Sequence, residues 1–74
     1  MAFDYSKLLG RIREKGLTQR ELAEQIGISP TTLSLKLGNN NFFTQKEVLK
    51  LCKVLDISDG DVAAYFFAEE VQKS

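Results

Sequence analysis

Histidine is absent from the 74-residue sequence, and cysteine and proline each occur once. The lone Cys52 cannot form an intramolecular disulfide, and without a cluster of Cys and His residues there is no zinc site. A Gly-rich phosphate loop is missing as well, and no close pair of acids lies where a cleft would form, so the sequence gives little support to an enzyme. We therefore expect no catalytic residues, metal, cofactor or small-molecule ligand.

Long hydrophobic runs are also absent. No stretch approaches the roughly 20 residues that a membrane-spanning helix needs, and the start, MAFDYSKLLG, lacks the basic and apolar regions of a secretory signal. Hydrophobic residues make up 43% of the chain and charged residues 27%, which is typical of a globular protein with one core. We expect a single domain over residues 1–74, in a reducing cytoplasm and without a membrane partner.

The net charge is zero, which at first argues against a nucleic-acid partner, but the charges are unevenly distributed. Residues 1–53 hold nine Lys and Arg against five Asp and Glu, a net +4, whereas residues 54–74 hold one Lys against five Asp and Glu, a net −4. An anion-binding face is therefore expected only in the first two thirds of the chain.

Three segments, LTQREL, FTQKEV and ISDGDV, share one pattern of side chains. In each, apolar residues flank a hydroxyl residue that is followed three positions later by an acid; the pairs are Thr18 with Glu21, Thr44 with Glu47, and Ser58 with Asp61. This pattern is a capping box within a hydrophobic staple, which marks a helix N-terminus and stabilises it by roughly 1 kcal/mol. With the helical spacing of apolar residues, it predicts an all-α fold of five helices, at about residues 4–15, 18–26, 29–37, 44–55 and 58–70.

The second and third of these helices are joined by a short segment around Gly27. So tight a turn, with Gly27 free to adopt the left-handed conformation, sets two helices at a steep angle, as in a helix-turn-helix. Ala23 permits their close approach, and four apolar residues would fill the angle between them: Leu22, Ile26, Ile28 and Leu33. In the third helix we expect Ser29 as the N-cap, Pro30 as the first residue and Gly38 at the end.

Two features favour nucleic-acid binding over a helical hairpin that only builds a core. Thr18 and Gln19 are a polar pair at a helix N-terminus, whose free N–H groups can hold a phosphate. The polar loop of residues 39–41 leads to another helix N-terminus at Thr44, which supplies a second set of backbone donors. Both sets are expected on the same side of the molecule.

Four stretches, YSKLLGRIREKG, LTQRELAEQIGIS, TLSLKLGNNNFFTQKEVLKLC and YFF, resemble the short phage-associated proteins of the XRE/Cro–CI repressor superfamily. The resemblance covers nearly the whole chain, from residue 5 to residue 67. It implies a compact, lambda-repressor-like DNA-binding domain, often dimeric on near-palindromic operators. It also implies a regulator of transcription in a phage or prophage, located in the cytoplasm of the bacterial host.

The resemblance implies base contacts on the groove-facing side of the 29–37 helix. It implies phosphate contacts from Gln19, from the N-cap of that helix and from the loop that follows it. Lys36 and the first-turn residues of two capped helices are further phosphate candidates. The candidate base contacts are Thr31, Thr32 and Leu35; the candidate phosphate contacts are Thr18, Gln19, Arg20, Ser29, Lys36, Asn40, Asn41, Thr44 and Lys46.

Two residues of the 29–37 helix have alternative roles. Leu35 lies roughly 160° from Leu33 and Leu37 and so faces outward, where it can contact a thymine methyl group or pack on the loop or a partner subunit. The superfamily usually has an apolar residue at position 36. Here Leu37 is expected to supply the core contact, and Lys36 to face outward toward a phosphate, a guanine edge or solvent.

Residues 65–67, YFF, cover about 200° of the last helix, so three large rings cannot all face one core. Phe66 is the expected core residue, and Tyr65 or Phe67 is expected to be exposed or buried in a homodimer interface. The alternative is a helix that wraps so that both rings reach the core. Phe42 is expected in the core or at its rim, and Cys52 is expected to be a small buried hydrophobe.

The sequence thus supports two hypotheses. The first is a sequence-specific regulator of transcription that binds double-stranded operator DNA with the 29–37 helix in the major groove. The second is a protein-interaction module of the same fold that binds another regulator and no DNA. Zero net charge and the acidic, aromatic end of the chain favour the second hypothesis.

Overall fold

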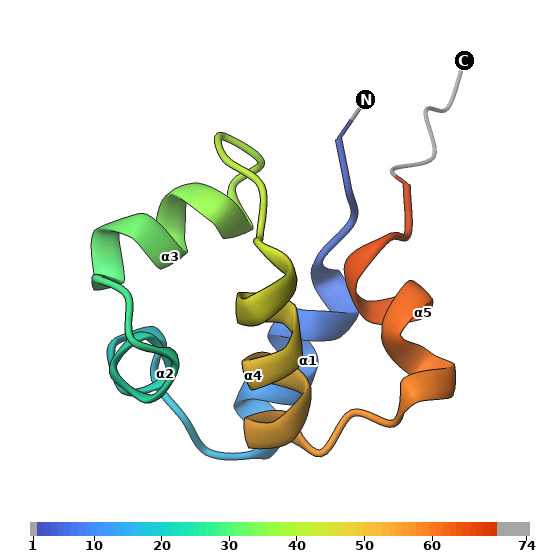
Figure 1. Ribbon diagram of the computed structural model, residues 1–74, viewed down its shortest axis with the longest axis horizontal. Coiled ribbons are helices and arrows are strands. Elements are labelled where there is room, and N and C mark those ends of the chain that lie inside the picture. Colours follow the sequence, from blue (N-terminus) through green and yellow to red (C-terminus); the bar gives the residue numbers. More distant parts are fainter. Residues whose placement is uncertain (1, 70–74) are drawn as a thin grey trace.

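Five α-helices and a short 3-10 turn form the regular structure of residues 2–69, the part of the chain that the computed structural model describes (Figure 1). In chain order they are α1 (Ser6–Glu14), α2 (Gln19–Ile26), α3 (Pro30–Leu37), α4 (Gln45–Leu55), the 3-10 turn η1 (Asp59–Asp61) and α5 (Val62–Phe66). The predicted all-α, five-helix fold is confirmed. Within residues 2–69, no helix has the length and apolar character needed to cross a membrane.

Two of the predicted capping boxes are present, at the starts of α2 and α4. The Thr18 hydroxyl accepts from the Glu21 N–H at 3.1 Å, and the Glu21 carboxylate accepts from the Thr18 N–H at 3.1 Å. Thr44 and Glu47 repeat this exchange at 3.2 and 2.9 Å. Each box satisfies two backbone donors that a helix N-terminus otherwise leaves without a partner, so these side chains define where both helices begin.

The third predicted box, at Ser58, does not form, because aspartate is one methylene shorter than glutamate. The Asp61 carboxylate accepts from the Ser58 hydroxyl at 2.9 Å, and no side-chain cap bonds the backbone there. The chain makes the η1 turn instead, and α5 runs only from Val62 to Phe66. A continuous helix over residues 58–70 is therefore wrong, and its predicted last residue lies outside the described part of the chain.

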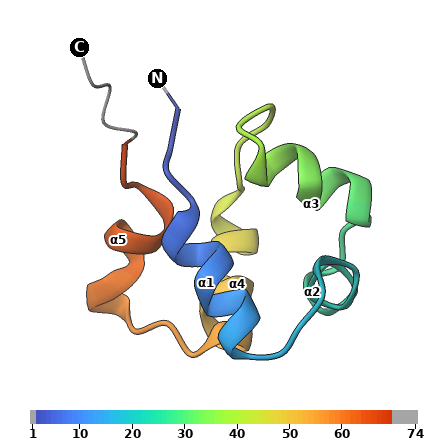
Figure 2. The same ribbon diagram turned by 180° about the vertical axis from the view of Figure 1, so that it is seen from behind.

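After α5 the chain runs back beside the N-terminal segment (Figures 1 and 2). The Asp4 N–H donates to the Ala68 carbonyl at 2.6 Å, and Phe3 forms an isolated antiparallel bridge with Glu69. The side chain of Asn39, from the α3–α4 loop, also binds Phe3, accepting from its N–H at 2.9 Å and donating to its carbonyl at 3.0 Å. The N-terminal segment thus ties the α3–α4 loop to the end of the fold.

The core lies between the helices, with α4 on one side and α1 on the other, as the two opposite views show (Figures 1 and 2). Its buried hydrophobic residues are Tyr5, Leu8, Ile12, Leu22, Ala23, Ile26, Leu33, Leu51, Leu55, Ile57 and Phe66. The predicted inward positions of α2 and the predicted core role of Phe66 are confirmed. Ile28 packs against this core as a half-buried residue.

Candidate functional site

The turn between α2 and α3 has the conformation that the sequence predicts. Gly27 is left-handed, with a φ of 80°, and the Ile28 N–H donates to the Ala23 carbonyl at 3.0 Å, which closes α2. Ala23 is fully buried, and its small side chain lets the two helices approach closely. Because α3 crosses α2 steeply (Figure 1), the pair has helix-turn-helix geometry.

Both ends of α3 are held by side chains. At its start, the Ser29 hydroxyl accepts from the Thr32 N–H at 3.0 Å, and Pro30 takes the first helical position, as predicted. At its end, Asn39 rather than Gly38 is the left-handed residue, with a φ of 66°. Asparagine tolerates this conformation better than most residues. Its two hydrogen bonds to Phe3 then fix the start of the polar loop of residues 39–41.

Thr31 and Leu35 face outward from α3, as predicted. Thr31 is exposed, and Leu35 is 41% exposed, whereas Leu33 on the opposite side of the helix is fully buried. Thr32 is half-buried, and its hydroxyl lies 2.7 Å from the Ser29 hydroxyl. Of the three candidate base contacts, Thr31 and Leu35 are therefore the ones that present accessible side chains to a partner.

The predicted outward position of Lys36 is wrong. Lys36 is 7% exposed, and its ammonium group forms an ion pair with the Glu47 carboxylate at the start of α4. Leu37, the expected core residue, is only half-buried. A lysine stem can pack along apolar surface while its charge is paired at the end, which lets Lys36 take a buried position.

Glu47 takes part in both the α4 cap and the ion pair. Burial raises the pKa of this carboxyl, but the hydrogen bonds from Lys36 and from the Thr44 backbone outweigh burial, so the pKa of Glu47 lies below its ordinary value. The pair joins the last turn of α3 to the first turn of α4. Lys36 is the only charged residue of α3, so the outward face of this helix carries no charge.

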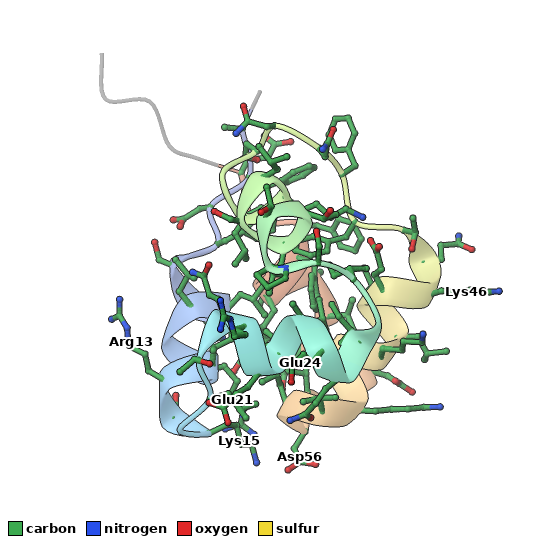
Figure 3. All side chains as sticks on the ribbon, turned by 90° about the vertical axis from the view of Figure 1, so that its left-hand side faces the viewer. Arg13, Lys15, Glu21, Glu24, Lys46 and Asp56 are labelled. Carbon is green, nitrogen blue, oxygen red and sulfur yellow. The ribbon has the colours of Figure 1, made fainter. Side chains whose placement is uncertain are left out.

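The candidate phosphate contacts other than Lys36 fall into two groups. Gln19, Arg20, Asn40, Asn41 and Lys46 are exposed. The hydroxyls of Thr18, Ser29 and Thr44 accept hydrogen bonds in the three helix caps. On the side that Figure 3 shows, Arg13 and Lys46 point outward at opposite edges, with Glu21 and Glu24 between them. The charges around these candidates are therefore of both signs.

A groove of about 570 Å³ lies between α4 and α5, beside the N-terminal segment; we call it the α4–α5 groove. Its lining is mostly apolar and includes Phe3, Phe42, Val48, Leu49, Val62 and Phe67. Three of these side chains are exposed to an unusual degree for apolar residues: Phe42 by 77%, and Leu49 and Phe67 by 57% each. Phe42 is therefore not a core residue, and it lies on the wall of this groove.

Sequence reasoning missed Leu49, although α4 carries a signal for it. Six of the last eight residues of α4, VLKLCKVL, are apolar, which is more than one face of a helix can bury. Leu49 lies one turn from Gln45 and one turn from Lys53, and all three are exposed. An apolar residue on that polar stripe predicts a surface leucine.

Of the two residues expected at a dimer interface, Phe67 is the exposed one. Tyr65 is half-buried against the core, and the Lys7 ammonium lies 5.0 Å from the centre of its ring. Phe67 packs edge-to-face on Phe3, with ring centroids 6.3 Å apart, at the wall of the α4–α5 groove. A homodimer through this end of the chain stays a prediction.

The arrangement offers no metal chemistry within residues 2–69, where no group of three or more Cys, Asp or Glu side chains could hold a metal ion. Cys52 is half-buried beside the α4–α5 groove. Burial raises the pKa of its thiol, and the nearby Asp59 raises it further, so the thiol stays protonated at neutral pH.

Comparisons with known proteins relate this chain to a phage protein. A family model described as "Protein of unknown function (DUF739)" matches residues 1–69. The solution structure of the modulator of repression (MOR) of the temperate bacteriophage TP901-1 from Lactococcus lactis is similar over 97% of this chain and 97% of that chain, with 42% sequence identity and a TM-score of 0.77. The search of curated proteins gave no match. The resemblance to phage-associated proteins is thus confirmed, while neither comparison names the repressor superfamily.

Proposed function

The chain belongs to the DUF739 family, and from this premise we propose that it is a phage regulator that modulates repression, as the name of its relative MOR says of that protein. It does so by binding another regulatory protein, the repressor of the same phage, through the outward face of α3. The observation that carries the proposal is the absence of charge on that face of α3.

A helix that reads DNA by itself normally offers long polar or cationic side chains. Guanine and adenine edges are read chiefly by Arg, Lys, Asn and Gln, and phosphates are neutralised by Lys and Arg. The outward face of α3 offers Thr31, Ser34 and Leu35, whereas the single cation of α3, Lys36, is buried and paired with Glu47. An uncharged face suits the centre of a protein–protein interface, from which charged residues are depleted. Leu35 is the natural anchor of such a contact.

Binding of double-stranded DNA is a second candidate, supported by the exposed residues at two helix starts. Gln19 and Arg20 lie in the first turn of α2, and Lys46 lies in the first turn of α4. Helix N-termini with such neighbours can hold phosphates, while Thr31 and Leu35 contact thymine methyl groups. For this function, Gln19→Ala would weaken binding to all sequences equally, whereas Leu35→Ala would change the sequence preference.

A matched pair of substitutions separates the two functions. Leu35→Lys places a cation on the outward face of α3, and Leu49→Lys makes the same change at an exposed leucine of α4. For a protein-binding face, Leu35→Lys should weaken binding of the purified repressor by tenfold or more, about 1.4 kcal/mol. Leu49→Lys should leave it unchanged. For a DNA-binding face, the added lysine should keep or raise the affinity for duplex DNA.

Isothermal titration of the repressor with each variant provides the measurement, and circular dichroism checks that both variants are folded. An unchanged repressor affinity in Leu35→Lys would contradict the proposal. A loss seen only in Leu49→Lys would move the repressor contact to the α4–α5 groove and would overturn the assignment of α3.

A further inference from the structure

We propose that the α4–α5 groove binds the apolar face of an amphipathic helix from a partner protein, with a Lys or Arg of that helix beside Asp59. None of the residues that line the groove belongs to α2 or α3. The groove is therefore a second binding surface, and the inference does not depend on the function proposed for α3.

The groove is formed by packed side chains and needs no rearrangement to open. The Phe43 ring packs edge-to-face on Tyr5 and on Phe66, with centroids 5.6 and 6.0 Å apart. Phe3 and Phe67 pack in the same way. The two hydrogen bonds between the Asn39 side chain and the Phe3 backbone keep the N-terminal segment beside the groove. Such a preformed apolar site lowers the cost of binding, because few side chains must be ordered.

The exposed apolar surface of the groove is smaller than the face that a stable symmetric dimer buries. Phe42, Leu49 and Phe67 are each more than half exposed and all line the groove. Since a large aromatic side chain has roughly 150–250 Å² of surface, the three together present on the order of 400 Å². A stable interface uses about 800 Å² of polar and apolar surface from each partner, so a symmetric dimer would have to bury about as much surface again outside these three side chains.

A single helix fits a surface of this size. Helices dock into grooves through apolar residues at positions i, i+3 or i+4, and i+7, which cover about two turns. The walls here are α4 on one side and α5 with the N-terminal segment on the other, so the groove can take side chains from one stripe of such a helix. The occupant is therefore a short amphipathic helix with large apolar residues in that pattern.

The charge around the groove determines which charge is favoured on the partner helix. Asp59 is the one charged residue in the lining, and within residues 2–69 it forms no ion pair. Residues 54–69 hold three Asp and one Glu and no Lys or Arg. An adjoining hollow that shares Leu49, Cys52 and Asp59 with the groove also contains Lys53 and Asp56, and Asp56 is paired with the Lys15 ammonium, so Asp59 is the acid that these ion pairs leave open to a partner. A cation on the partner helix is favoured beside Asp59.

The test uses a displayed library of helical peptides with Leu or Phe fixed at i, i+4 and i+7 and all flanking positions randomised. Peptides selected on the full-length chain are made synthetically, and their affinities are measured by fluorescence anisotropy. We expect enrichment of Lys or Arg at one flank and a loss of affinity of tenfold or more with Leu49→Lys. Leu35→Lys is the matched control and should leave the affinity unchanged. Asp59→Asn should abolish the preference for a basic flank over a neutral one.

Three outcomes would overturn the inference. The first is that no helical peptide is selected. The second is that neither Leu49→Lys nor Phe42→Ser changes the binding of the selected peptides. The third is that the wild-type chain sediments as a dimer and that Leu49→Lys dissociates this dimer. The last result would identify a second copy as the occupant. Since Leu35→Lys tests the α3 face and Leu49→Lys tests the groove, the failure of one assignment is distinguished from the failure of the other.

Discussion

Replacing Glu47 by glutamine measures how much the ion pair that holds Lys36 away from the outward face of α3 contributes to the free energy of unfolding. Glutamine retains the side-chain oxygen that completes a capping box, so the start of α4 is preserved. What is lost is the negative charge beside the Lys36 ammonium, in a site where the Lys36 and Glu47 side chains are 9% and 13% exposed. The substitution therefore isolates the ion pair from the cap.

The expected cost follows from this burial. Removing one partner of a fully buried pair costs about 3–5 kcal/mol, but here some solvent contact and the glutamine oxygen remain, so we expect about 2–3 kcal/mol for Glu47→Gln. Lys36→Met keeps an unbranched apolar stem, and the remaining Glu47 carboxylate still accepts from the Thr44 N–H, so we expect a smaller loss of about 1 kcal/mol. The double variant should resemble Lys36→Met, which gives a coupling energy of about 2 kcal/mol between the two positions.

Urea denaturation of the four proteins, followed by circular dichroism, measures these differences in the free energy of unfolding. At this size, a loss of 2–3 kcal/mol also lowers Tm by roughly 10–20 °C. A cost below about 0.5 kcal/mol for Glu47→Gln would refute the reasoning, because exposed pairs contribute that little. Lys36 would then be free to reach a phosphate, as the sequence suggested.

The remaining predictions concern pH and two backbone positions. Because the folded-state pKa of Glu47 is depressed, its contribution to stability is complete above its ordinary pKa of about 4.3 and is lost as pH falls through the lower folded-state value. The stability difference between wild type and Glu47→Gln should therefore shrink as the pH falls below about 4.3, and a constant difference in acid denaturation would argue against the pair. Gly27→Ala forces a side chain into the left-handed region and should cost about 1–2 kcal/mol by urea denaturation; a neutral result would mean that the turn can relax. Asn39→Ala removes two hydrogen bonds to Phe3 and places alanine in a left-handed conformation that asparagine tolerates better, so we expect a cost of about 2 kcal/mol. Amide exchange in the N-terminal segment should become faster. Unchanged exchange would contradict the role of Asn39 in holding that segment.

Sequence reasoning succeeded where the deciding contacts are local. The capping boxes of Thr18 and Thr44 join residues three positions apart, and Gly27 acts through its own backbone conformation. Lys36 could not be placed in this way, because a helical wheel counts lysine as polar. Its partner Glu47 comes within reach only when α3 packs against α4.

The α4–α5 groove was missed for a similar reason. The prediction extended the last helix to residue 70, whereas the short reach of Asp61 replaces its first turn with η1 and leaves α5 with five residues. The helical positions of Leu49 and Phe67 already indicate that they are exposed, but the groove between them forms only because α5 and the returning chain lie beside α4 and Phe3. That arrangement arises from tertiary packing, which no pattern within one helix reports.

The most direct test measures the affinity of the isolated chain for duplex DNA of random sequence at several salt concentrations, by fluorescence anisotropy. The affinity for the purified repressor is measured in parallel by the same method. An uncharged outward face of α3 predicts binding to the repressor and no DNA binding with a steep salt dependence. A DNA affinity that falls steeply between about 50 and 200 mM salt would show that several Lys and Arg residues neutralise phosphates, and it would contradict the central claim.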